Sequence, residues 1–232
     1  MILSKEKLST LHSLYSQRQF EQVIQQGDDL IKEFSQDNNL LNILAASNIG
    51  LGRFNIAIEH YKKAIDLKPM DAEAYNNIGV AYKEKGDISR AIKNYQQAVN
   101  LNPSYVAAHI NLGTALQENH NYKTAIEVFK RVIELTPDNE RAYNNLGACY
   151  RAENQRAAAK DSYQLAIKHS KDYTLAYNNL GVLLYEEGDF EGAIEIYNQA
   201  LQINPNDPHI HANLGKILST KNQSAEAIES YQ

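Results

Sequence analysis

Hydrophobic and polar positions along the chain recur in a pattern that repeats every 34 residues. In the row 72–105, apolar residues recur at three- and four-residue steps from Ala74 to Tyr82, and again from Ile88 to Leu101. This spacing places apolar side chains on one face of an α-helix. Each row therefore predicts two amphipathic helices of about 14 residues, or roughly 21 Å each at 1.5 Å per residue.

Seven such rows follow one another in one register without an insertion. The first keeps only a skeleton of the pattern, and the last is cut short. We expect a single array over 1–232, with rows at approximately 4–37, 38–71, 72–105, 106–139, 140–173, 174–207 and 208–232. Places within a row are numbered from its first residue, so that Ala72 occupies place 1.

Two kinds of residue break the helical pattern at constant places. Glycine, which readily takes the left-handed conformation that closes a helix, follows the first stretch. It does so at Gly52, Gly86 and Gly188. Other rows carry His120, Asn154 and Asn222 there, and we expect the turn to persist because both residue types tolerate that conformation. Proline, which lacks the amide proton and clashes with the preceding turn, ends the second stretch at Pro69, Pro103, Pro137 and Pro205.

A further glycine lies in the middle of the first predicted helix in five rows. A helix-interior glycine costs about 1 kcal/mol relative to alanine, so its recurrence indicates that another helix crosses too closely for a side chain. We interpret recurring alanine and aromatic residues of the second helix as part of this packing. The glycines are Gly79, Gly113, Gly147, Gly181 and Gly215, and the aromatic residues are Tyr61, Tyr95, Phe129, Tyr163, Tyr197 and Tyr231.

These recurring residues resemble a known repeat. The row 72–105 carries Tyr75, Ile78, Gly79, Tyr82, Ala91, Tyr95, Ala98 and Pro103 at the places that define the tetratricopeptide repeat (TPR). The resemblance covers essentially the whole chain. It implies an all-α fold, a right-handed α-α superhelix (solenoid) of TPR helical hairpins, with the first helix of each row on the concave face.

In that superhelix, places 2, 5, 6, 9, 12 and 13 face a groove. An asparagine recurs at place 6, and in three rows a second one precedes it; an amide can both donate to and accept from a peptide backbone. The spacing resembles the asparagine ladder with which the TPR superhelix of O-linked N-acetylglucosamine transferase grips extended peptides. The candidate groove residues are Asn77, Asn111, Asn145, Asn179, Asn213, Asn76, Asn144 and Asn178, with the charged residues Glu73, Lys83, Arg141 and Arg151.

One other reading of the asparagines stays open. Asparagine is common at this place across the TPR family, and these residues can instead bond to adjacent helices. A clamp for a terminal carboxylate, as in co-chaperone repeat domains, needs lysine at place 5 and asparagine at place 9. No row combines them, so we do not expect such a clamp.

Composition narrows the function classes. A net charge of −5, without a long run of like charges, disfavours nucleic-acid and anionic-membrane partners. One cysteine, Cys149, cannot form an internal disulfide. With neither a signal-peptide core at Met1 nor a stretch long enough to span a bilayer, we expect a cytoplasmic protein.

Catalytic chemistry is not expected. The seven histidines occupy scattered places, and His209 and His211, two residues apart, point to different sides of a helix. Cys149 stands where other rows have Ala, Leu or Ile, as a small buried residue would. We therefore predict no catalytic residue, no metal site and no cofactor.

Two functions remain open. The first is a protein-interaction scaffold that binds an extended peptide or a helix in its groove. The second is the substrate-recruiting TPR region of a larger enzyme, such as a glycosyltransferase, with its catalytic domain beyond Gln232. An uncapped apolar end near Gln232 also suggests self-association.

Overall fold

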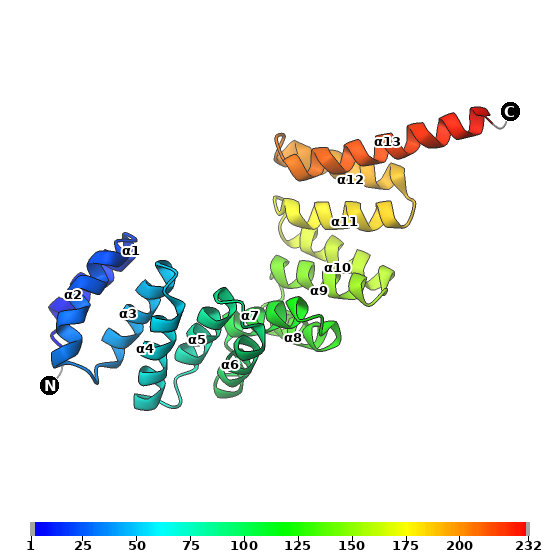
Figure 1. The fold of residues 1–232 in the computed structure, drawn as a ribbon. Helices are drawn as coiled ribbons and strands as arrows, with labels where there is room; N and C mark the ends of the chain where they lie inside the picture. Colours follow the sequence, from blue (N-terminus) through cyan, green and yellow to red (C-terminus); the bar gives the residue numbers. More distant parts are fainter. Residues whose placement is uncertain (1–2, 231–232) are drawn as a thin grey trace. The chain divides into compact units, whose positions relative to one another are not determined.

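The computed structural model describes residues 3–230, with side chains for 3–220. The described part is α-helical throughout and contains no strand (Figure 1). Contacts divide the chain into two compact units, Met1–Asn121 and Tyr122–Gln232. The units are described separately, and the predicted all-α class of repeated helices is confirmed in both.

The helices follow the predicted rows in order. The first unit contains α1 (Lys5–Ser16), α2 (Phe20–Glu33), α3 (Asn38–Gly50), α4 (Phe54–Leu67), α5 (Ala72–Glu84), α6 (Ile88–Leu101) and α7 (Val106–Glu118). The second contains α8 (Tyr122–Leu135), α9 (Glu140–Ala152), α10 (Arg156–His169), α11 (Thr174–Glu186), α12 (Phe190–Ile203) and α13 (Pro208–Ser230). Odd-numbered helices are the first helices of their rows, and even-numbered helices are the second.

The turn between the two helices of a row takes the expected left-handed residue at place 15. Gly52, Gly86 and Gly188 have φ values of 71°, 86° and 81°, while His120 and Asn154 both have φ 58°. Arg18, which the pattern did not single out, takes the same conformation in the first row, with φ 58°. The register of the row therefore imposes the turn even on residue types that pay a steric cost for it.

The expected turn at Asn222 is wrong. The backbone continues through it as one helix, α13, from Pro208 to Ser230. An asparagine in the left-handed conformation costs conformational energy. A helical hairpin recovers that energy only when its second helix packs against the first. A straight helix keeps every i to i−4 hydrogen bond without that cost. The predicted uncapped end near Gln232 and the aromatic place at Tyr231 lie outside the described residues.

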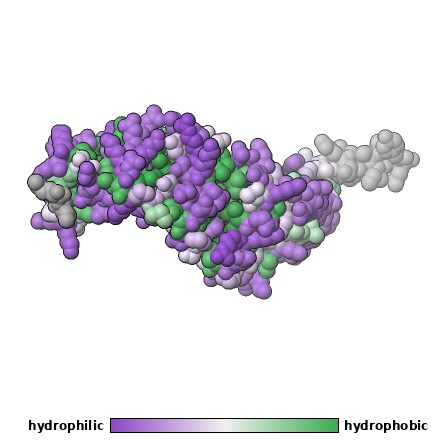
Figure 2. Space-filling model, turned by 90° about the horizontal axis from the view of Figure 1, so that it is seen from below, coloured by the Kyte–Doolittle hydropathy of each residue, from purple (hydrophilic) through white to green (hydrophobic). Residues whose placement is uncertain are grey.

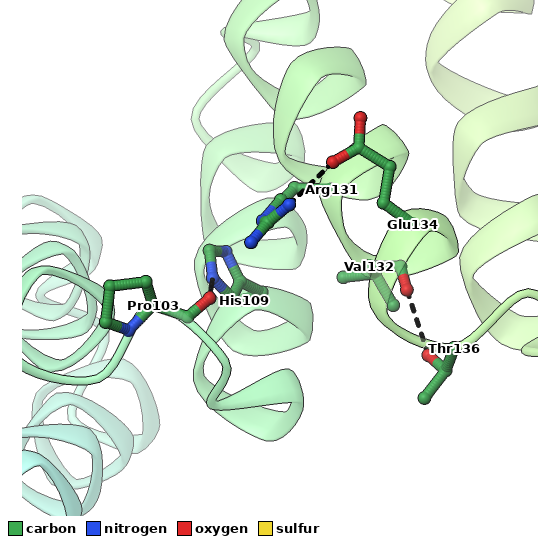
Figure 3. A network of polar contacts seen from close by, with 6 residues as sticks. All are labelled: Pro103, His109, Arg131, Val132, Glu134 and Thr136. Carbon is green, nitrogen blue, oxygen red and sulfur yellow. Dashed lines mark hydrogen bonds and ion pairs between the residues drawn. The ribbon is translucent and has the colours of Figure 1, made fainter.

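Three of the loops between rows are closed by a hydrogen bond from the side chain at place 4. His109 Nε2 hydrogen-bonds the carbonyl oxygen of Pro103 at 3.0 Å (Figure 3), and His211 Nε2 bonds that of Pro205 at 2.8 Å. Tyr177 Oη donates to the carbonyl of Lys171 at 3.0 Å. The loop that carries Lys171 is one that lacks the recurring proline. Figure 3 also shows the end of α8, where the Thr136 hydroxyl donates to the Val132 carbonyl at 2.9 Å. Two of the seven histidines thus have a structural role.

Three of the mid-helix glycines pack against the aromatic residue at place 24 of the same row, whereas Gly215 has no described atom within 4 Å of the position of a Cβ. A Cβ on Gly79 would lie 2.6 Å from Tyr95 Cε1, and one on Gly147 would lie 2.7 Å from Tyr163 Cε1. Gly181 meets Tyr197 in the same way. These aromatic rings are almost completely buried. The close approach inferred from the glycine column is therefore present, and its partner is an aromatic ring of the second helix.

Within each unit, the first helices form the inner layer. In the first unit α1, α3, α5 and α7 contact one another in sequence, and in the second α9, α11 and α13 do so. Among the described residues, successive second helices make no comparable contacts. On the face drawn in Figure 2, hydrophilic residues predominate and hydrophobic ones lie in smaller patches between them. The inner layer of first helices carries the candidate site residues.

Candidate functional site

The asparagines of the inner layer form hydrogen bonds between rows. In the first unit, Asn111 Nδ2 donates to Asn76 Oδ1 at 2.9 Å. In the second, Asn179 donates to Asn144 and Asn213 donates to Asn178, both at 2.8 Å. Each bond joins place 6 of one row to place 5 of the row before it.

These bonds give the asparagine column a structural role. Asn76 and Asn144 are 6% and 2% exposed, so they lie between rows and not on the open inner surface. Because the buried carbonyl of each receives an N–H, neither is left with an unpaired acceptor. The partly exposed donors, such as Asn111 and Asn179, each retain a carbonyl oxygen and a second N–H for a ligand.

Asn77 and Asn145 differ from the other place-6 asparagines. Among the described residues, their only hydrogen bonds come from the preceding asparagine of the same helix, at 3.3 Å from Asn76 and 3.5 Å from Asn144. Both are partly exposed. They are therefore the place-6 amides whose removal disturbs the packing between rows least.

The charged candidates follow a second inter-row pattern. Lys83 Nζ lies 2.9 Å from Glu118 Oε1 in the first unit, and Arg151 Nε lies 3.7 Å from Glu186 Oε2 in the second. Both pairs join place 12 to place 13 of the next row, and all four side chains are partly exposed. Such pairs contribute at most about 1 kcal/mol each. Glu73 and Arg141 form no ion pair among the described side chains.

A cavity of about 420 Å³ opens on the inner surface of the first unit. Its lining comes from the predicted groove places of three rows, together with one place-24 tyrosine. The lining residues are His12, Tyr15, Asn39, Asn42, Ile43, Ala46, Tyr61, Glu73 and Asn77. Of these, only Glu73 and Asn77 were candidates from the sequence, because the first two rows depart most from the repeat. Applying the same places to those rows would have identified the others.

Buried hydroxyl groups at place 24 lie beside the inner surface. Burial raises the pKa of Tyr61, and Tyr15 and Glu73 nearby raise it further. Burial also raises the pKa of Tyr163 and of Tyr197 to about 12. These phenols are therefore protonated at neutral pH and can serve as hydrogen-bonding groups, not as bases.

The inter-row asparagine pair of the second unit can be tested by mutation. Asn179→Ala is expected to lower the free energy of unfolding by about 1–3 kcal/mol, because it leaves the buried carbonyl of Asn144 unpaired. Urea unfolding of Asn144→Leu, Asn179→Ala and the double variant should give a coupling energy of about 0.5–1.5 kcal/mol. Asn145→Ala, which removes only the long 3.5 Å bond from Asn144 within the same helix and no inter-row bond, should cost less than Asn179→Ala. Additive single effects would contradict the pairing.

The single cysteine lies in the core. Cys149 is fully buried, and burial raises the pKa of its thiol to about 12, which keeps it protonated. No group of three or more His, Cys, Asp or Glu side chains that could hold a metal ion occurs among the described residues. Within the same part of the chain, no helix has the length and apolarity needed to cross a membrane.

Comparison with known proteins agrees with the repeat geometry. One relative in sequence is the probable UDP-N-acetylglucosamine–peptide N-acetylglucosaminyltransferase SEC of Arabidopsis thaliana, which is 28% identical over 84 residues. That match spans 36% of this chain and only 9% of the relative.

Solved structures with similar folds cover more of the chain. MamA has a TM-score of 0.66 and 25% identity, over 70% of this chain and 95% of its own. YrrB, described as a TPR protein with an unusual peptide-binding site, has a TM-score of 0.65 and 23% identity, over 80% and 96% of the two chains.

Family models locate the repeats themselves. The model described as TPR repeat matches residues 50–86, 81–120 and 183–222, and the model described as tetratricopeptide repeat matches residues 104–172. Together these matches cover most of the chain. The chain belongs to the tetratricopeptide repeat family.

Proposed function

We propose that this protein is an interaction scaffold that binds an extended peptide or a helix of a protein partner along the inner layer of first helices. The observation that carries the proposal is the repeated supply of partly exposed amides on that layer. The place-6 asparagines offer donors and acceptors in each of the five rows from residue 72 onward, including those that also bond between rows. Such groups can hold a peptide backbone without depending on its side chains.

Two further observations support this function. The cavity in the first unit opens among the same helices and carries both polar and apolar lining groups, as pockets that bind ligands do. The similar fold of YrrB is described as carrying a peptide-binding site. A repeat fold alone does not name the ligand, so we argue the partner from the inner surface of this chain.

The experiment separates the binding role of the amides from their structural role. Asn77→Ala/Asn145→Ala is expected to weaken the affinity for a partner identified by affinity capture and mass spectrometry. Loss of each neutral amide bond costs about 0.5–1.5 kcal/mol, or roughly two- to tenfold per side chain. Affinity is measured with the purified partner, by calorimetry.

The matched control is Asn55→Ala/Asn198→Ala, which removes two exposed amides from second helices, one in each unit. It should leave the affinity unchanged. Equal affinities for the wild type and Asn77→Ala/Asn145→Ala, with unaltered circular dichroism, would reject the inner layer as the binding surface.

A second candidate function is favoured by the partial match to the plant glycosyltransferase. In that case the array is the substrate-recruiting region of a larger enzyme. Reading the open reading frame past Gln232 tests it directly, because a catalytic domain encoded in frame is required. The amide surface would have the same binding role in either protein.

A further inference from the structure

The cavity of the first unit contains one buried acceptor without a partner in the described part of the chain. Asn42 donates its Nδ2 to Asn38 Oδ1 at 2.9 Å, which orients the amide. Its carbonyl oxygen, Oδ1, is buried and has no hydrogen-bond partner among the described residues. A buried acceptor without a partner costs free energy. A small rotation of the amide toward the cavity would let the N–H donor of a ligand reach this oxygen and recover the cost.

The charge of the cavity lining is negative. Glu73 is the only Asp, Glu, Lys or Arg residue in the lining, and it forms no ion pair among the described side chains. Lys83, ten residues further along α5, is held by Glu118 at 2.9 Å and is not part of the lining. The cavity therefore presents an unpaired carboxylate without a lysine or arginine beside it in the lining.

An acidic residue at place 2 occurs in one row only. The place of Glu73 is occupied in other rows by Lys5, Asn39, Ala107, Arg141, Leu175 and His209. The acid is thus absent from place 2 of every other row, and in rows 4–37 and 140–173 a cation replaces it. A ligand group that depends on the carboxylate can be bound in this way only near α1, α3 and α5.

The remaining walls suit a flat cation. Tyr15 lines the cavity and is 37% exposed, so part of its ring is open to a ligand. A guanidinium group carries five N–H donors in one plane and stacks on aromatic rings, whereas an ammonium group is a compact point charge. The volume of about 420 Å³ falls within the range of about 300–1,000 Å³ that is typical of ligand pockets.

We propose that this cavity is a specificity subsite for the guanidinium group of an arginine in the bound peptide. The subsite rests on the proposed scaffold function and adds a side-chain preference to it. Glu73 pairs with the guanidinium, Asn42 Oδ1 accepts one of its N–H groups, and the ring of Tyr15 covers its face. The amides along the rest of the inner layer would then hold the peptide backbone.

The probe is the acetylated and amidated pentapeptide Gly-Gly-Arg-Gly-Gly, titrated into the full chain and followed by ¹H–¹⁵N NMR. The matched probe replaces arginine with citrulline, which keeps the shape and loses the charge. Saturable shifts are expected at the backbone amides of Asn39, Asn42 and Asn77. The arginine peptide should bind several times more tightly, and added salt should reduce the difference.

Variants assign the contacts. Glu73→Gln should weaken binding of the arginine peptide by up to about fivefold, as for a partly exposed ion pair, and should leave the citrulline peptide unaffected. Asn42→Ala should weaken both. Glu59→Gln, which makes the same charge change at an exposed position of α4 outside the cavity, should weaken neither.

Three results would overturn the subsite: equal affinity for the two peptides, shifts confined to residues outside the cavity, or the absence of saturable binding at millimolar peptide. If any of them occurs while Asn77→Ala/Asn145→Ala still weakens a native partner, the subsite is rejected and the scaffold function stands. If the arginine preference holds and that double variant binds its partner normally, the subsite stands and the amide surface is rejected.

Discussion

Replacing Tyr163 with alanine is expected to lower the free energy of unfolding by about 3–5 kcal/mol, the range for removing a large buried aromatic side chain. Tyr163 is 0% exposed and its ring packs against the backbone of Gly147. The cavity left behind lies between α9 and α10, so neither helix can collapse into it without losing its own contacts. Urea unfolding measures the loss, and amide hydrogen exchange in α9 and α10 shows whether it is local, as expected for a repeat array.

The control for this variant is Tyr163→Phe. The hydroxyl of Tyr163 is buried and has no hydrogen-bond partner among the described residues. Removing it should therefore leave the stability unchanged or raise it by up to about 1 kcal/mol. A large loss in Tyr163→Phe would mean that the hydroxyl, and not the ring, carries the stabilisation.

Gly147→Ala and Gly215→Ala should differ in their effects on stability by about 1–3 kcal/mol, the cost of overpacking. Both glycines occupy place 8 of a first helix, so the gain in helix propensity, about 1 kcal/mol, is common to both changes. At Gly147 the new Cβ would lie 2.7 Å from Tyr163 Cε1 and 2.8 Å from Cδ1 of a ring that cannot move aside. At Gly215 it would meet no described atom within 4 Å.

Thermal unfolding of the two variants tests this difference. Gly215→Ala should hold or raise the melting temperature, and Gly147→Ala should lower it. If the two variants changed the melting temperature equally, the recurrence of glycine at place 8 would have a cause other than close packing against the place-24 ring.

The candidate site was only partly predictable from the sequence. The places that line the cavity follow from the repeat register, and Glu73 and Asn77 were assigned to the groove on that ground. The bonds from Asn111 to Asn76 and from Asn179 to Asn144 join residues 35 apart in the sequence. A column of asparagines is compatible with both ligand binding and inter-row bonding, and only the structure shows which asparagines bond between rows. Asn76 and Asn144 are buried, whereas Asn77 and Asn145 are partly exposed.

The sequence by itself determined the helices, their order and their turns, because these depend on local chemistry repeated at a constant period. The left-handed residues at His120 and Asn154 and the glycines under Tyr95 and Tyr163 occur where the register predicts them. Only the tertiary structure decided the continuation of α13 through Asn222, the pairing of asparagines between rows and the unpaired carbonyl of Asn42. Each of these depends on what a neighbouring row places against the residue, and a residue's own row does not contain that information.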